Sequence, residues 1–328
     1  VSLPISVTTR TGMPVSGQVT ARSEMLYDEA LFAPLPCGAT VGWSDPGVVA
    51  RGNVTTVKSW LNTLGVFTNP SAYLAAHTQY DQCGSVRKIY DARDTALTNP
   101  TQITYSHQFS YPTLNTSSDP DGGGPSLALT TSTEYDVSTG LVTATIDANG
   151  QKTAFSYNDP LNRLTKIVRA ETDAVAKNHT TYAYDDSART IPATSDLYTY
   201  DDNLLKTVTK YDGLGRMTES QTFEDGTNYI TTQQQYDTSG RVFKTSNPFR
   251  PLIETPDWTT TTYDALSRVL TVMTPDNAVV STTYSGNTVT VTDQTQKKRK
   301  SVTDALGRLI EVYEDPDVLN YQTTYLYD

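Results

Sequence analysis

The sequence predicts an all-β protein made of tandem β-hairpins, and three observations support this prediction. The composition favours strands over helices, a Tyr-Asp dipeptide recurs along the chain, and the residues around this dipeptide repeat as a unit. A hairpin of two strands cannot bury its own face, so neighbouring hairpins must stack on one another. We therefore expect one long antiparallel sheet that grows by adding hairpins.

The composition departs from that of an average globular protein. Apolar residues make up 37% of the 328 residues and charged residues only 19%, whereas typical domains are about 45–50% apolar. Thr, at about one residue in six, and Tyr, with 21 copies against 7 Phe, fill the difference. Both side chains suit a pleated, half-wet sheet surface. Thin cores and wide polar sheet faces follow from this.

Charge and hydropathy exclude several classes of protein. A net charge of −11 repels phosphate and disfavours nucleic-acid binding. No apolar run approaches the roughly 18 residues needed for a membrane span, and no signal region follows Val1. The chain starts without Met and stops within a Tyr-Asp motif at Tyr325–Asp328. We expect a processed product or a piece of a longer protein.

Ten Tyr-Asp dipeptides occur, where chance pairing of the Tyr and Asp residues would give about two. They begin at Tyr27, Tyr80, Tyr90, Tyr135, Tyr184, Tyr200, Tyr211, Tyr236, Tyr263 and Tyr327.

The residues after the dipeptide repeat as well. Tyr211–Met217, Tyr236–Val242 and Tyr263–Val269 share the frame Tyr-Asp-x-x-Gly-Arg-apolar, with Ser267 replacing the Gly once. Thr303–Leu309 keeps the frame without the Tyr, and Tyr157–Leu164 is a looser copy with one extra residue. The residues predicted to build the repeat are Tyr157, Arg163, Tyr211, Asp212, Gly215, Arg216, Tyr236, Asp237, Gly240, Arg241, Tyr263, Asp264, Arg268, Asp304, Gly307 and Arg308.

Each position of the frame has a physical role. The Thr- and Val-rich stretch before the Tyr favours a strand, and the Asp opens a turn by accepting hydrogen bonds from backbone amides. The Gly tolerates a positive φ where the chain reverses, and the Arg with its apolar neighbour starts the return strand. The Arg either pairs with the Asp of its own turn or lies over the Tyr ring of an adjacent unit. Both alternatives are structural, because a residue present in every unit serves the unit rather than a reaction.

These units resemble those of RHS-repeat, or YD-repeat, proteins, from about residue 50 to the end, with Arg51-Gly52-Asn53-Val54-Thr55 as a weaker Gly-Asn variant. The resemblance implies an antiparallel β-ribbon that spirals into a hollow shell. In bacterial toxin systems such shells enclose a C-terminal toxic domain, and in the related animal teneurins the shell serves adhesion. Toxin-carrying members close the shell with an Asp-Pro-x-Gly-type motif in a C-terminal core segment. The Asp-Pro pairs of this chain do not match that motif in its surroundings. We expect a stretch of shell wall, a partial turn, rather than a closed container.

The regularity of the repeat divides the chain into three parts. Residues 1–50 are expected to be an irregular β cap or a preceding repeat, residues 51–130 degenerate repeats with a loop at 115–127, and residues 131–328 regular repeats. Residues 56–77 are predicted as a strand pair, with a short helix as the alternative. The acidic, Gly-rich loop at 115–127 is either a solvated loop or a weak Ca²⁺ site.

The sequence contains few residues that point to catalysis or to metal binding. Cys37 and Cys83 form either one disulfide or two free thiols, with no CxxC pattern. His77, His107 and His179 lie in no metal-ligand spacing, and no catalytic or nucleotide-binding motif occurs. Paired carboxylates such as Asp185-Asp186 and Asp201-Asp202 are assigned to repeat turns. The basic run Lys297–Lys300 is interpreted as a solvated turn, with an anionic partner as the alternative. No catalytic residue, cofactor or metal is expected.

The predicted function is therefore a non-enzymatic scaffold, part of an extracellular or cell-surface shell, wall or fibre. Its expected partners are further copies of itself, joined edge to edge or head to tail, or the flanking parts of a larger RHS protein. An enclosed polypeptide or a surface glycan would be a further partner. The alternative function is an adhesin or carbohydrate-binding module with Trp43, Trp60 or Trp258 as a sugar platform, although these residues fall at unrelated repeat positions.

Overall fold

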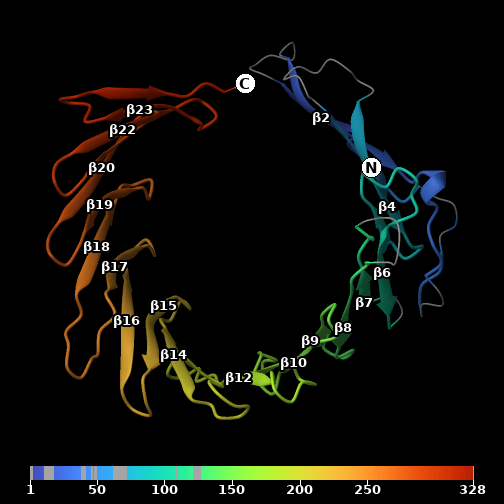
Figure 1. Cartoon of the computed structure of the whole chain (residues 1–328), viewed down its shortest axis with the longest axis horizontal. Coiled ribbons are helices and arrows are strands. Elements are labelled where there is room, and N and C mark those ends of the chain that lie inside the picture. Colours follow the sequence, from blue (N-terminus) through green and yellow to red (C-terminus); the bar gives the residue numbers. More distant parts are fainter. Residues whose placement is uncertain are drawn as a thin grey trace. The chain divides into compact units, whose positions relative to one another are not determined.

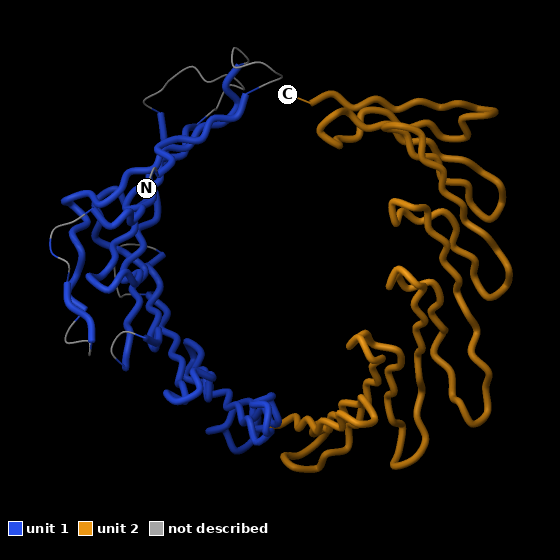
Figure 2. Tube along the Cα trace, turned by 180° about the vertical axis from the view of Figure 1, so that it is seen from behind, with its two compact units in different colours: residues 1–177 blue, residues 178–328 orange. Residues whose placement is uncertain are grey.

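The computed structural model confirms the predicted all-β fold. It describes residues 3–10, 18–37, 42–45, 47, 50–61, 72–107, 110–120 and 127–327. In these ranges the only helical element is a single 3-10 turn at Ala30–Phe32. The chain forms two compact units, residues 1–177 and residues 178–328 (Figure 2).

Unit 1 is a meander in which every strand pairs antiparallel with the next strand along the chain (Figure 1). Its strands are β1 (Ser6–Arg10), β2 (Val19–Tyr27), β3 (Val54–Trp60), β4 (Tyr73–Tyr80), β5 (Val86–Tyr90), β6 (Thr101–Ser106), β7 (Tyr111–Thr116), β8 (Thr130–Tyr135), β9 (Val142–Ile146), β10 (Lys152–Ser156) and β11 (Lys166–Arg169).

Unit 2 is built in the same way, again with each strand paired antiparallel to its successor. Its strands are β12 (Asn178–Tyr182), β13 (Thr190–Ser195), β14 (Leu205–Tyr211), β15 (Met217–Phe223), β16 (Tyr229–Tyr236), β17 (Val242–Ser246), β18 (Trp258–Tyr263), β19 (Val269–Met273), β20 (Val279–Ser285), β21 (Thr288–Thr292), β22 (Lys298–Thr303), β23 (Leu309–Glu314) and β24 (Tyr321–Thr324).

In each unit the alternation of strand direction sorts the turns onto two edges of the sheet. Because the chain reverses at every turn, every second turn lies at the same edge. The turns that follow β14, β16, β18 and β22 carry the Tyr-Asp-x-x-Gly-Arg frame or its Thr303 variant, so they share one edge of unit 2. We call this the YD edge of unit 2, and the corresponding YD edge of unit 1 holds the turns after β2, β4, β6, β8 and β10.

The core is thin, as the composition predicts. Among the described residues the fully buried apolar side chains are few, and buried polar side chains outnumber them: Phe32, Cys37, Tyr90, Ala144, Phe249 and Val312 against Thr55, Thr56, Asp81, His179, Thr180, Gln221, Thr231 and Ser246. A sheet with so little buried apolar area depends on its hydrogen-bond ladders and on cross-strand side-chain pairs.

The described part of residues 56–77 belongs to strands β3 and β4, so the helix alternative is wrong there, and residues 62–71 lie outside the described residues. The heart of the expected loop at 115–127, residues 121–126, also lies outside them. The assignment of Lys297–Lys300 to a solvated turn is wrong for three of its residues, because β22 begins at Lys298.

The charges of the basic run find partners in β23 and in the connection that follows it, so the run is accommodated in a strand. The Lys297 ammonium lies 3.4 Å from Asp315, the Arg299 guanidinium lies 2.9 Å from Glu314, and the Lys300 ammonium lies 3.8 Å from the centre of the Tyr313 ring. The acidic residues that neutralise the run lie about 15 residues further along the chain, so a local sequence pattern does not reveal them.

The division of the chain at residues 50 and 130 describes the regularity of the repeat and stays a prediction.

Candidate functional site

The turns of the YD edge share one hydrogen-bond pattern. In the turn after β14 the Asp212 N–H donates to the Arg216 carbonyl at 2.9 Å, and the Gly215 N–H donates to the Asp212 carbonyl at 3.1 Å. The Asp212 carboxylate accepts from the N–H groups of Leu214 and Arg216 at 2.9 and 3.0 Å. Gly215 has a φ of +76°, which explains the Gly of the frame. The same pattern recurs in the turns that begin at Asp237, Asp264 and Asp304.

The Arg of each frame also binds the Asp of its own turn. The Nε–carboxylate distance is 2.7 Å for Arg216 and Asp212, and equivalent pairs occur at Asp159–Arg163, Asp237–Arg241, Asp264–Arg268 and Asp304–Arg308. Hydrogen bonds from the Arg216 backbone and side chain hold the pKa of Asp212 below its usual range. The Arg163 side chain lowers the pKa of Asp159 to about 2. The turn carboxylates are therefore charged above mildly acidic pH.

The same Arg lies over the Tyr ring of the next hairpin. The Arg216 guanidinium carbon is 4.4 Å from the centre of the Tyr236 ring, and the pairs Arg241–Tyr263, Arg268–Tyr284 and Arg308–Tyr327 lie at 4.7, 4.2 and 4.8 Å. The two contacts that the sequence left as alternatives thus occur together: each Arg joins the Asp before it to the Tyr after it.

The Tyr hydroxyl closes the contact between neighbouring hairpins. The Tyr236 hydroxyl donates to the Met217 carbonyl at 2.7 Å, at the first residue of the preceding return strand. The same bond occurs for Tyr157, Tyr263, Tyr284 and Tyr327, with the carbonyls of Val142, Val242, Val269 and Leu309. We call this chain of Asp–Arg pairs, Arg–Tyr stacks and Tyr hydroxyl bonds the YD ladder.

Not every Tyr-Asp dipeptide forms a YD turn. Tyr90 ends β5 and Tyr200 lies between β13 and β14, and both connections are at the edge opposite the YD edge. The assignment of Asp201-Asp202 to a repeat turn is therefore wrong. Asp202 instead accepts three consecutive backbone N–H groups, from Leu197, Tyr198 and Thr199, at 2.7–2.9 Å. These bonds hold the pKa of the Asp202 carboxyl well below its usual range.

The first YD turn of unit 1 is split open by a long insertion. Asp28 donates its N–H to the Asn53 carbonyl at 3.0 Å and accepts from the N–H groups of Gly52 and Asn53 at 2.7 and 3.2 Å. Gly52 has a φ of +76°, and the Tyr27 hydroxyl donates to the Pro4 carbonyl at 2.6 Å. These are the contacts of a YD turn, with Asn53 at the Arg position. Residues 29–51 separate Asp28 from Gly52, whereas in the regular turn only two residues separate Asp212 from Gly215.

The insertion is fastened to the next YD turn. The Leu35 N–H donates to the Tyr80 carbonyl at 2.9 Å, and the Gln82 N–H donates to the Leu35 carbonyl at 2.8 Å. A disulfide joins Cys37 to Cys83, which settles the alternative that the sequence left open. The described part of the insertion therefore packs along the YD edge.

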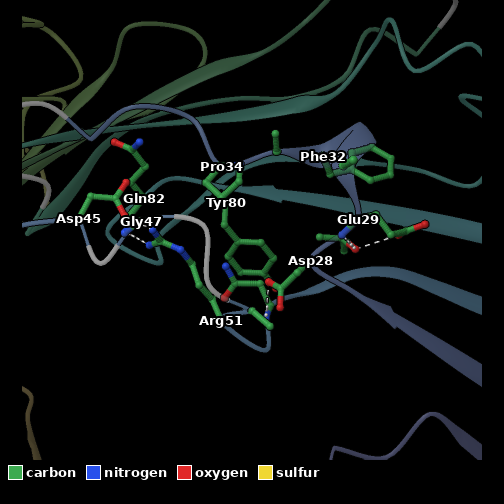
Figure 3. Close-up of a pocket in the computed structure, with 14 residues that line it drawn as sticks. Asp28, Glu29, Phe32, Pro34, Asp45, Gly47, Arg51, Tyr80 and Gln82 are labelled. Atoms are coloured by element: carbon green, nitrogen blue, oxygen red, sulfur yellow. Dashed lines mark hydrogen bonds and ion pairs between the residues drawn. The ribbon is translucent and has the colours of Figure 1, made fainter.

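A cavity of about 540 Å³ lies under the insertion (Figure 3). Its lining includes Asp28, Glu29, Phe32, Pro34, Arg51, Asn53, Tyr80 and Gln82. The Arg51 guanidinium binds the Gln82 carbonyl and the Asp45 carboxylate. Glu29 accepts the Thr55 hydroxyl at 2.8 Å and the Thr56 hydroxyl, which fixes its carboxylate. Sequence reasoning missed this cavity because its parts are far apart in the chain.

The histidines serve the sheet. His77 stacks on Phe32 with ring centres 4.8 Å apart, and burial lowers the pKa of its imidazole. His179 is buried in β12, and its Nδ1 lies 2.7 Å from Asp196. Among the described residues no group of three or more His, Cys, Asp or Glu has the arrangement of a metal site. In the same part of the chain no helix is long and apolar enough to cross a membrane.

Comparisons with known proteins agree with this architecture. The family model "RHS Repeat" matches residues 135–174, from the end of β8 to just past β11. A search of curated proteins finds no match. The crystal structure of TcdB2-TccC3 without its hypervariable C-terminal region superposes with a TM-score of 0.65 over 94% of this chain, at 13% identity. The Photorhabdus luminescens Tc holotoxin pore gives a TM-score of 0.51 over 99% of this chain, at 11% identity.

The chain covers about a fifth of each of these two structures, 22% and 19% of their lengths. Fold and turns together define a class of tandem β-hairpin arrays in which an Arg–Tyr ladder runs between consecutive hairpins. Within that class residues 135–174 match the RHS repeat, and the chain shares its fold with TcdB2-TccC3.

Proposed function

We propose that the chain is a non-enzymatic scaffold that forms a length of wall in a secreted or cell-surface RHS shell. The observation that supports this best is the YD ladder. In each regular repeat the conspicuous polar residues, Tyr, Asp and Arg, contact their own turn or the next hairpin. Polar groups engaged in this way stiffen a thin sheet. The stability of the array is then approximately the sum of the stabilities of the single hairpins and of the contacts between neighbouring hairpins.

The proposal includes an enclosed polypeptide as cargo. The fold shared with TcdB2-TccC3 supports this part, and so does the small number of buried apolar side chains among the described residues. Both faces of the sheet are largely polar and half-exposed, as expected for a wall with solvent or cargo on either side. Partners would be the flanking parts of the same product or other subunits of a larger complex.

Two of the three Trp residues of the adhesin alternative are engaged within the sheet, whereas Trp43 is 37% exposed and lies in the insertion. Trp60 packs edge-on against Tyr73 at 5.6 Å and receives the Arg22 guanidinium at 5.8 Å from its ring centre. Trp258 has the Lys244 ammonium at 6.0 Å. Side chains in such contacts do not form a free aromatic platform for a sugar, so we favour the scaffold.

Protease protection of the natural full-length product tests the proposal. We expect polypeptide outside the repeats to resist a nonspecific protease under native conditions and to be cleaved once the array is melted. The double substitution of Arg216→Ala and Arg241→Ala, which interrupts the YD ladder twice, should expose that polypeptide at a lower temperature. Cleavage at the same rate before and after melting would contradict the proposal.

A further inference from the structure

Among the described residues, the opened YD turn places no cation over the Tyr80 ring, whereas four of its counterparts carry one. In four repeats a guanidinium lies 4.2–4.8 Å from the Tyr ring of the next hairpin. The residue that would place its side chain over Tyr80 is at the Arg position of the opened turn, and it is Asn53. Within the described residues, the Tyr80 hydroxyl also lacks the carbonyl bond that Tyr236 makes.

The Tyr80 ring, over which the ladder has no guanidinium, borders a cavity. Tyr80, Asn53 and Asp28 all line the space of about 540 Å³ under the insertion (Figure 3), a volume within the range of small-ligand pockets. The β8–β9 turn also lacks the Arg, with Leu141 bonded to Asp136 at that position. There Asp136 and Leu141 are joined by a short turn with no insertion, so loss of the Arg alone does not create the cavity.

The charges around the cavity favour a cation. Within the described part of the chain the Asp28 carboxylate accepts backbone N–H groups alone, whereas Asp212 also binds a guanidinium. Glu29 and Asp45 add two carboxylates and Arg51 one guanidinium, so the four side chains sum to −3 + 1 = −2. An aromatic face beside carboxylates is a favourable environment for a cation.

The chain itself does not supply that cation from the insertion. Residues 29–51 contain a single basic residue, Arg51. Its guanidinium is bound to the Gln82 carbonyl and the Asp45 carboxylate, and Figure 3 shows it directed toward Asp45.

We propose that this cavity binds a guanidinium group from outside the chain, which completes the interrupted YD ladder between Asp28 and Tyr80. The group would come from an arginine side chain of a partner polypeptide or from a free guanidino compound. Phe32 and Pro34 would contact the apolar stem, and Asp28 and the Tyr80 ring would hold the charged end. This inference does not depend on the proposed shell function.

Calorimetric or NMR titration of the whole chain tests it with three probes: a short peptide with one central arginine, free agmatine, and the same peptide with citrulline, which has the shape but not the charge. We expect saturable binding of a guanidinium probe and at least about tenfold weaker binding of the citrulline peptide. Binding of the peptide alone would identify a polypeptide partner, and equal binding of agmatine would identify a small-molecule site. Failure of both guanidinium probes at millimolar concentration would overturn the proposal.

Substitution at the Arg position gives the sharpest test. Asn53→Arg supplies the missing guanidinium from within the chain, so it should abolish binding and leave the thermal midpoint equal or higher. Asn53→Gln, which lengthens the side chain without adding a charge, should keep binding, and Tyr80→Leu should weaken it about tenfold. Arg241→Asn bares the Tyr263 ring where no insertion forms a cavity, so it should create no site. Unchanged guanidinium affinity in the folded Asn53→Arg variant would refute the model.

Discussion

The YD ladder predicts that a single Tyr hydroxyl contributes measurably to the joint between two hairpins. The Tyr263 hydroxyl donates to the Val242 carbonyl at 2.6 Å, so Tyr263→Phe removes one hydrogen bond and keeps the ring. Such a bond contributes about 1 kcal/mol net. For a unit of this size that corresponds to a fall of about 2–4 °C in the melting temperature. Tyr198, which is 81% exposed, provides the matched control as Tyr198→Phe.

The stack on the same ring can be measured separately. The Arg241 guanidinium lies 4.7 Å from the centre of the Tyr263 ring. A double-mutant cycle of Arg241→Ala with Tyr263→Leu isolates the contact from the ion pair that Arg241 makes in its own turn. We expect a coupling free energy of about 0.5–1 kcal/mol.

Native-state hydrogen exchange is the decisive assay, because a repeat array opens locally and need not unfold in one step. Tyr263→Phe should lower the protection of amides in β17 and β18 and leave β22 and β23 unchanged. If Tyr263→Phe behaves like Tyr198→Phe, or if protection falls evenly across unit 2, the ladder does not act as a nearest-neighbour joint.

Three further predictions concern acid, the disulfide and a strained turn. The folded pKa values of the turn carboxylates lie below that of an unfolded Asp, about 3.9, so their stabilisation is complete above that pH and is lost as the pH falls through the folded values. Those values reach about 2 for Asp159 and Asp225, so the circular dichroism signal should hold from pH 7 to about 5 and fall between about pH 4 and 2. Reduction of the Cys37–Cys83 disulfide, which closes a loop with a sequence separation of 46, should destabilise unit 1 by about 4 kcal/mol; an unchanged melting curve in reductant would contradict this. Ser267 has a φ of +63° at the Gly position of its turn, so Ser267→Gly should stabilise unit 2 by about 1 kcal/mol in denaturant titration, and a loss of stability would contradict the strain argument.

The sequence predicts the regular turns well because their interactions are local. Asp212 and Arg216 are four residues apart, and the turn between them is fixed by the φ of Gly215. The Arg–Tyr stack was one of two alternatives, and the sequence could not show that the two occur together. The edge of each guanidinium binds the preceding Asp through Nε, while its planar face lies over the next Tyr ring. The sequence pattern does not specify this geometry.

The parts that the sequence could not predict depend on distant residues. Gly52-Asn53 resembles only a weak variant of the repeat, because the Asp of its turn lies 24 residues before Gly52, at Asp28. The assignment of Asp201-Asp202 to a repeat turn failed for the opposite reason. The Tyr-Asp dipeptide is present, but the alternation of strand direction places it at the opposite edge of the sheet. The edge at which a turn lies depends on how many strands precede it, and no local motif records that number.

The opened turn shows why the YD edge can acquire new features without loss of the array. Its essential bonds join the Asp28 carboxylate to two backbone N–H groups, and they persist with residues 29–51 inserted between them. The cost of closing a loop rises only slowly with its length, and the Cys37–Cys83 disulfide and the Leu35 bridge reduce it further by fixing the insertion to the next turn. The Arg position of this turn holds Asn53, so the ladder is interrupted at the point where the cavity lies. In the wall that we propose, a binding site of this kind would occupy a single turn, while the regular turns that begin at Asp212, Asp237, Asp264 and Asp304 keep their contacts.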